Sequence, residues 1–281
     1  MLRLIRDVAR RKGALLGGIM LFVLVLIALM APWLTPYNPT AQDLRLRLLP
    51  PLTPEHPLGT DELGRDILTR IIFGSRVSLL VGACSVLLGL VLGTLIGITS
   101  GYFGQRYDTV MMRLMDVMMT FPTLLLAIAI VATLGGGMFN LMLAIGISNI
   151  PRFARLVRGE ALRLRNLDYV EAARAAGASN GRIMLRYMLP NLLSALIVMI
   201  TLRVGVAILV ESSLAYLGLG VPPPTPTWGG MVSRGQRFLL FAPWMSLVPG
   251  TAIMILVFSI NLFGDGLRDA LDPQLRGDQA T

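Results

Sequence analysis

The chain has 281 residues, of which 54% are hydrophobic and only 15% are charged, and its formal net charge is +9. A soluble domain of this length carries about a quarter charged residues, so the composition excludes an ordinary soluble protein and indicates an integral membrane protein. The arginines border apolar runs, which argues against a nucleic-acid-binding patch. Cys84 and His56 are the only residues of their types, so an intrachain disulfide is excluded and a metal site is not expected.

The N-terminal residues 1–12 are rich in arginine, and an uninterrupted apolar run follows. About 20 such residues span a bilayer as a helix, and a basic flank is typical of the cytoplasmic side. A cleaved signal peptide is the alternative, but Pro32 directly follows the small residues at which cleavage would occur. We therefore expect a cytoplasmic N-terminus at 1–12 and a first transmembrane helix at 13–34.

A polar, proline-rich segment at residues 35–76 is expected to be an extracytoplasmic loop, with a short helix over Arg65–Phe73 lying on the membrane surface. Residues 77–264 are expected to hold five further spans, and 265–281 form a cytoplasmic tail. These spans lie at about Val77–Thr99, Met111–Leu134, Phe139–Val157, Leu192–Leu214 and Pro243–Phe263. The expected fold is an all-α membrane protein of six transmembrane helices with both termini cytoplasmic, which places most basic residues inside.

Two features predict how the spans pack. Gly89, Gly93 and Gly97 lie on one face of the second span, where a neighbouring helix can approach closely. Phe121-Pro122 is expected to kink the third span, because proline has no backbone N–H to donate.

A cytoplasmic coupling segment at residues 158–191 joins the fourth and fifth spans. Glu171–Ala176 is nearly all alanine, which favours a helix, and Gly177 permits a sharp bend. A basic amphipathic helix follows and is expected to end at Leu189-Pro190. That second helix could lie on lipid headgroups, but the alanine helix has little apolar bulk to insert. We therefore interpret the segment as a docking surface for a second protein.

No catalytic site is expected in this chain. The only lysine is Lys12, which follows two arginines, so a P-loop for nucleotide hydrolysis is absent. The acidic residues form no cluster of catalytic acids. We expect a non-catalytic subunit without a cofactor of its own, so any ATP hydrolysis would occur on another polypeptide.

Arg203 and Glu211 lie within the fifth span. Arg203 is about 18 Å along the helix from Asn191, near the middle of the bilayer, where a charge is costly unless it is paired or faces water. Glu211 lies roughly 80° further round the helix, so the two are not expected to pair directly. Both are candidates for lining a translocation pathway, and holding the bundle together is the open alternative.

The coupling segment resembles the EAA loop of permease subunits in type I ABC importers. That loop has the pattern EAA, three residues, Gly, nine residues, Ile, any residue, Leu-Pro. The residues that match are Glu171, Ala172, Ala173, Gly177, Leu189 and Pro190. Tyr187 stands where the pattern has isoleucine, which is a mild departure. The resemblance implies that the matching residues couple the chain to an ATPase.

Three further blocks are similar to the dipeptide/oligopeptide/nickel permease branch: LGTDELGRD (58–66), YLGLGVPPPTPTWGGM (216–231) and NLFGDGLRDALDP (261–273). The resemblance implies a multi-pass protein of the bacterial inner membrane that pairs with a second homologous permease. Two cytoplasmic ATPase subunits, which bind ATP and Mg, would contact the EAA loop, and an extracytoplasmic solute-binding protein would deliver a peptide.

Two alternatives stay open. The same machinery could import nickel or glutathione, because specificity is expected to lie mainly in the binding protein. A rival of another class is an ion-coupled secondary transporter that uses Arg203 and Glu211. That rival predicts inverted internal repeats, and the two halves of the sequence show no clear repeat.

Overall fold

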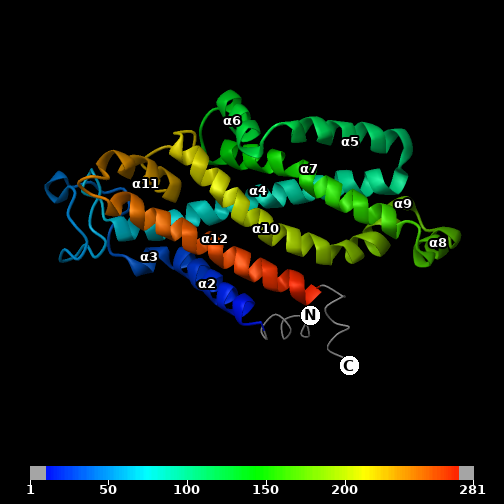
Figure 1. The fold of residues 1–281 in the computed structure, drawn as a ribbon, viewed down its shortest axis with the longest axis horizontal. Coiled ribbons are helices and arrows are strands. Elements are labelled where there is room, and N and C mark those ends of the chain that lie inside the picture. Colours follow the sequence, from blue (N-terminus) through cyan, green and yellow to red (C-terminus); the bar gives the residue numbers. More distant parts are fainter. Residues whose placement is uncertain (1–10, 272–281) are drawn as a thin grey trace.

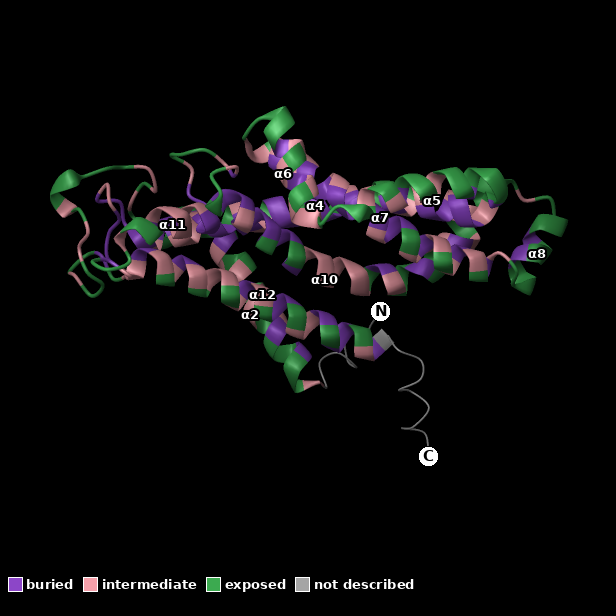
Figure 2. Ribbon diagram, turned by 45° about the horizontal axis from the view of Figure 1, so that its top comes forward, coloured by how far each residue is buried: buried purple, intermediate pink, exposed green. Residues whose placement is uncertain are grey.

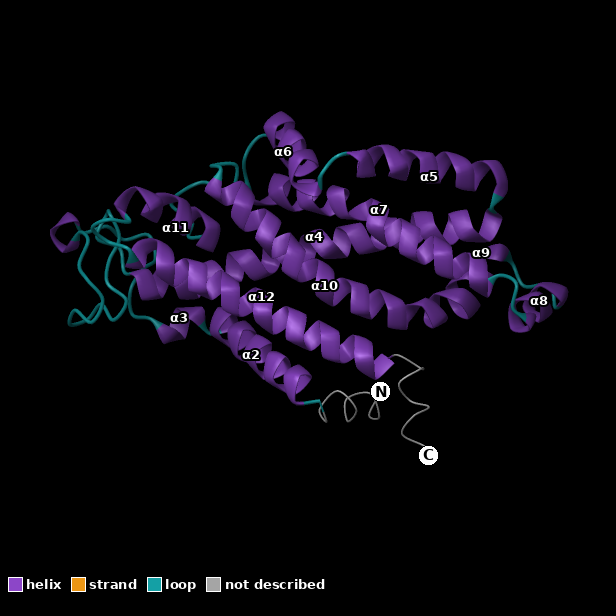
Figure 3. Cartoon of the chain, viewed as in Figure 1, coloured by secondary structure: helices purple, strands orange, loops and turns teal. Residues whose placement is uncertain are grey.

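The computed structural model describes residues 11–271, and every regular element in that range is helical (Figures 1 and 3). The longer helices, in chain order, are α2 (Lys12–Leu29), α4 (Ile67–Phe103), α5 (Gln105–Thr120), α6 (Thr123–Leu134), α7 (Met138–Leu164), α10 (Leu189–Tyr216) and α12 (Trp244–Leu271). The shorter ones are α3 (Ala31–Leu34), η1 (Leu44–Leu46), α8 (Asp168–Ala175), α9 (Asn180–Arg182), η2 (Ile183–Met188), α11 (Trp228–Gly235) and η3 (Gln236–Phe238).

The long helices α4, α7, α10 and α12 run roughly along the long axis of the molecule (Figure 1). The loop over residues 35–66 and α11 gather at one end, which we call the α11 end. The helix α8 lies at the opposite end, which we call the α8 end. Buried residues are concentrated where α4, α7 and α10 meet, whereas much of α2 is exposed (Figure 2). Many of the exposed residues of α2 are large and apolar. The fold thus separates two polar ends by an apolar middle.

The contact between α4 and α7 is the most extensive between any two described elements. It depends on the predicted glycine stripe. A Cβ atom at Gly89 would lie 2.8 Å from the Cβ of Asn149, and one at Gly97 would lie 2.5 Å from the carbonyl oxygen of Ala154. Both distances are too short for real side chains, so only glycine lets the backbones approach this closely. The prediction of close packing along this stripe is confirmed.

Four described helices are long and apolar enough to cross a membrane: α2, α4, the helix over Asn180–Tyr216, and α12. The pair α5 and α6 would add a fifth, although the two are bent by 92° at Phe121-Pro122. The expected kink is therefore a full break between two helices, because Phe121 takes an extended conformation before the proline. Six spans require α7 as well, so the six-span count stays a prediction.

The separate surface helix expected over Arg65–Phe73 does not form. Instead, α4 begins at Ile67, and the Asp66 carboxylate accepts the backbone N–H of Thr69 at 2.7 Å as a cap. Ile67 is buried because the preceding loop folds back over the first turns of α4. With 37 residues, α4 is about 55 Å long, so it extends beyond the roughly 30 Å hydrocarbon core.

Candidate functional site

The segment between α7 and α10 forms the α8 end of the molecule (Figure 1). On α8, Glu171 and Ala172 are exposed, whereas Val170 and Ala173 are buried in the main hydrophobic core. The burial of Ala173 contradicts the expectation that the whole EAA stretch is a docking surface. A helix lying against the bundle must bury one of its faces, and Ala173 belongs to that face.

The C-terminus of α8 is closed by the predicted bend at Gly177. The N–H of Ala178 donates to the carbonyl oxygen of Ala173 at 3.1 Å, and the N–H of Gly177 donates to that of Arg174 at 3.0 Å. These two hydrogen bonds form a Schellman motif, in which the residue after the helix is left-handed. Gly177 has φ +78°, a conformation that glycine adopts without cost. The bend thus depends on backbone conformation rather than on packing.

Gly177→Ala is expected to destabilise this turn by about 1 kcal/mol, because a Cβ is disfavoured at positive φ. The matched control is Gly181→Ala in α9, which has ordinary helical φ; a Cβ at either position meets no atom within 4 Å. Amide hydrogen exchange across α8 should therefore accelerate in the first variant and be unchanged or slower in the second. Equal exchange in both variants would show that the left-handed conformation is not required.

The helix after the turn does not end at Leu189-Pro190. One continuous helix runs from Asn180 to Tyr216, with a π turn, η2, immediately before Leu189. There, the N–H of Leu189 donates to the carbonyl oxygen of Met184, five residues earlier. A π turn widens the helix where the ring of Pro190 would otherwise clash with the preceding turn. The α8 end is thus joined to a membrane-spanning helix without a break.

Side-chain contacts tie the segment to its neighbours. The Tyr102 hydroxyl at the end of α4 donates to the Asn180 side-chain oxygen at 2.8 Å. The Arg174 guanidinium lies 5.8 Å from the centre of the Tyr102 ring, a cation–π distance. Asn191 on α10 donates to the Tyr169 hydroxyl of α8 at 3.3 Å. A displacement of α8 would therefore act on both α4 and α10.

The turn residues 177–181 read GASNG, which has the G-x-S-x-G spacing of a hydrolase nucleophile elbow. Such an elbow places its serine between a strand and a helix. Ser179 instead follows the helix α8, and His56, the only histidine, belongs to the loop at the opposite end. The spacing does not indicate hydrolase chemistry here.

Arg203 and Glu211 occupy different environments on α10. Glu211 is fully buried and accepts hydrogen bonds from Ser78 of α4 at 3.4 Å and from Ser212 at 3.3 Å. Arg203 is half-buried and lines an open groove. No ion pair joins these two residues in the structure, as expected from their angular separation. The position of Glu211 favours a role in holding α4 against α10, whereas Arg203 faces open space.

Acidic residues of α5 pair with arginines of α7. Arg158 makes a bidentate ion pair with Asp108, with distances of 2.5 and 2.6 Å, and Arg155 pairs with Asp116. These pairs fix α5 alongside α7 near the α8 end. They also neutralise two arginines of α7. Arg152, one turn before Arg155 on the same helix, has no carboxylate partner among the described residues and instead donates to Ser148 and Thr123.

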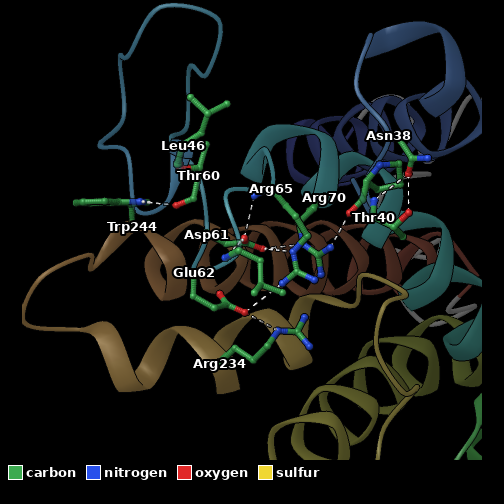
Figure 4. Close-up of polar contacts among 12 residues, drawn as sticks. Asn38, Thr40, Leu46, Thr60, Asp61, Glu62, Arg65, Arg70, Arg234 and Trp244 are labelled. Atoms are coloured by element: carbon green, nitrogen blue, oxygen red, sulfur yellow. Dashed lines mark hydrogen bonds and ion pairs between the residues drawn. The ribbon is translucent and has the colours of Figure 1, made fainter. Parts of the chain in front are cut away.

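At the α11 end, a buried ionic cluster joins the loop, α4 and α11 (Figure 4). The Asp61 carboxylate lies 2.7 Å from the Arg65 guanidinium and 3.4 Å from that of Arg70. Glu62 lies 3.1 Å from Arg65 and 3.8 Å from Arg234. Three arginines thus share two carboxylates. The sequence did not predict that these five residues would contact one another.

The cluster shows that part of the expected solvated loop is folded core. Burial, followed by the charge of Arg65, lowers the pKa of Arg234. His56 and Asp66 are also buried and lie 2.9 Å apart. The block LGTDELGRD was the available signal for ion pairs in this loop, because it places Asp61 and Glu62 four and three positions before Arg65. The sequence could not show that Arg70 and Arg234 complete the cluster.

Comparison with known proteins identifies the chain. Residues 93–277 match the family described as binding-protein-dependent transport system inner membrane component. Residues 3–51 match the N-terminal TM domain of oligopeptide transport permease C. The chain belongs to this family of transport permeases. The family match confirms the resemblance to type I ABC importer permeases, and it makes the chain an inner-membrane transport subunit.

The relatives of this permease include transporters named for several substrates. The chain is 46% identical to the di/tripeptide transport system permease protein DppC of Pseudomonas aeruginosa, over 95% of this chain and 90% of that protein. It is 43% identical to the glutathione transport system permease protein GsiD of Pectobacterium atrosepticum, over 96% of this chain and 90% of that protein. A probable D,D-dipeptide transport system permease protein of Escherichia coli is 42% identical over 94% of this chain and 88% of that protein.

A solved structure supports the same fold. The chain superposes on a chain of the inward-facing MetNI methionine ABC transporter with a TM-score of 0.58 and 19% sequence identity. The superposition covers 72% of this permease and 96% of that chain. At this level of identity, the likeness establishes the fold alone, and it confirms the all-helical permease architecture.

Proposed function

We propose that this permease is one membrane subunit of an ATP-driven importer of short peptides. The relatives described above carry names of dipeptides, tripeptides and glutathione, which is itself a tripeptide, at similar identity. Nickel receives no support from these relatives. The shared substrate class is therefore a short peptide, although the similar identities do not separate one peptide from another.

In this proposal, α8 and the Gly177 turn are the surface that a cytoplasmic ATPase contacts. The supporting observation is that Glu171 and Ala172 are exposed on a short helix, and that the Gly177 turn connects this helix to the continuous helix over Asn180–Tyr216, which includes α10. A contact that differs between the open and closed ATPase dimer would displace α8, and the helix over Asn180–Tyr216 would carry this displacement into the bundle. Leu189 and Pro190 lie at the junction, where the π turn provides a place for bending.

The remaining parts of the importer follow from this arrangement. A second, homologous permease would complete the pathway, and two ATPase subunits with ATP and Mg would bind at the α8 end. An extracytoplasmic solute-binding protein would deliver the peptide at the α11 end. This orientation requires both termini and α8 to be cytoplasmic, with six spans that include α7.

Uptake of radiolabelled dialanine into proteoliposomes containing the purified complex and its solute-binding protein tests this function against the ion-coupled rival. We expect uptake to require ATP and to persist when ionophores collapse the ion gradients. The opposite pattern, in which uptake is lost with the gradients and is independent of ATP, would support a secondary transporter that uses Arg203 and Glu211.

A further inference from the structure

A groove of about 570 Å³ opens between α7, α10 and α12, in the half of the molecule nearer the α8 end. Its floor is one face of α10, from Ser194 to Arg203, and most of the lining side chains are apolar. Glu160 of α7 and Arg268 of α12 are the other charged residues of its wall. The groove is open rather than enclosed, so a ligand could enter it without unfolding the bundle.

The groove carries positive charge that the described part of the chain does not neutralise. Glu160 is already paired with Arg163 at 2.9 Å, and neither Arg203 nor Arg268 has a carboxylate partner among residues 11–270. Arg152 of α7 lies close enough to Arg203 for the two positive charges to repel each other. An unpaired guanidinium at this depth is costly, and a carboxylate bound to it would lower that cost.

The depth of Arg203 argues for a ligand that passes through the protein. Arg203 is about 21 Å along α10 from Leu189, near the middle of a hydrocarbon core about 30 Å thick. Lipid headgroups lie at the surfaces of the bilayer, so a phospholipid phosphate reaches this position poorly. Arg268, at the end of α12, is in contrast placed near the membrane surface.

The dimensions fit a short peptide. The floor from Ser194 to Arg203 extends about 14 Å along the helix axis. An extended chain spans about 3.4 Å per residue, so this length accommodates roughly four residues. Apolar walls would accept side chains of varied size, whereas every unmodified linear peptide ends in one carboxylate.

We propose that this groove is a transient peptide site of the permease in which Arg203 binds the C-terminal carboxylate of the substrate. The inference rests on the proposed peptide-import function. It adds that the permease recognises the C-terminal carboxylate of the peptide. Recognition of the carboxylate, and not of the side chains, would let one pathway pass peptides of different sequence.

Protection of a cysteine in the groove tests this site without depending on the solute-binding protein. The native Cys84 is replaced by serine, and Ser194→Cys introduces a single exposed thiol in the groove. The probes are trialanine and trialanine amide, which differ only in the terminal carboxylate. The rate of N-ethylmaleimide labelling is measured on the detergent-purified complex containing the full chain, and again in nanodiscs with anionic or neutral lipid.

Trialanine is expected to slow labelling by about tenfold and its amide by less than about twofold, because a charge-assisted hydrogen bond contributes roughly 1.5–3 kcal/mol. Adding Arg203→Gln should abolish this difference, whereas Arg203→Lys should retain part of it. If Arg203→Gln fails to fold, the comparison of the two peptides in the Arg203 protein still decides the outcome.

Three results would overturn the proposal: equal protection by both peptides, full discrimination in Arg203→Gln, or protection by anionic lipid without any effect of peptide. These results are distinct from a failure of the proposed function. An importer that takes up dialanine with ATP but shows no discrimination in this assay would refute the carboxylate site alone.

Discussion

Replacing Gly93 with alanine is expected to prevent stable packing of α4 against α7. A Cβ at this position would lie 2.5 Å from the Cβ of Phe153 and 2.8 Å from the carbonyl oxygen of Ile150. Neither atom can move without displacing the backbone of α7, so the helices must separate. We expect a loss of about 3 kcal/mol, at the upper end of the range for overpacking, seen as a large fall in thermal midpoint and in monodisperse yield.

The matched control for this prediction is Gly159→Ala. Gly159 lies on α7 itself, but a Cβ there meets no atom within 4 Å. Alanine also favours helix over glycine, so stability should be unchanged or raised by up to about 1 kcal/mol. If Gly93→Ala has the same thermal midpoint as the parent, as Gly159→Ala is expected to have, this result would contradict the close packing described for α4 and α7.

Asp61→Asn is expected to destabilise the α11 end by about 3–5 kcal/mol, the usual cost of breaking a buried ion pair. The variant keeps the size of the side chain but leaves Arg65, Arg70 and Arg234 with Glu62 as their one carboxylate. The thermal midpoint should fall strongly, and proteolysis of the loop over residues 35–66 should accelerate.

Glu55→Gln is the control, because Glu55 belongs to the same loop but is exposed. It should change stability by less than about 0.5 kcal/mol. Adding Arg70→Met to Asp61→Asn should recover part of the loss, since it removes the excess positive charge. No recovery in the double variant, or an equal effect of Glu55→Gln, would argue that the cluster contributes through packing and not through charge.

Properties that depend on periodicity could be predicted from the sequence. The apolar runs gave the long helices, the spacing of Gly89, Gly93 and Gly97 predicted a close helix contact, and Gly177 predicted the bend. Each is local: hydropathy, helical spacing and left-handed φ are properties of a few consecutive residues. The EAA pattern adds a family likeness, and residues 93–277 match the model of that permease family.

Properties that depend on distant partners could not be predicted. The sequence predicts Arg70 in a surface helix, but Arg70 is buried. It donates to the carbonyl oxygen of Pro39 at 2.6 Å and lies 3.4 Å from the Asp61 carboxylate. The helix through Pro190 was also missed, because proline usually ends a helix and the π turn that accommodates it has no signature in composition. Ala173 is buried because of the way α8 packs against the bundle. The alanine-rich sequence could not show which face of α8 would be buried.

The central claim is that α8 binds the ATPase, and charge reversal at Glu171 tests it most directly. The amount of ATPase subunit that co-purifies with the permease would be measured for Glu171→Lys and for Glu55→Lys, which reverses an exposed charge at the opposite end. We expect Glu171→Lys to reduce the bound ATPase by about tenfold or more, since an unfavourable charge in an interface costs several kcal/mol, and Glu55→Lys to retain the parental amount. Parental amounts of bound ATPase, together with parental ATP-dependent uptake, in Glu171→Lys would contradict the claim.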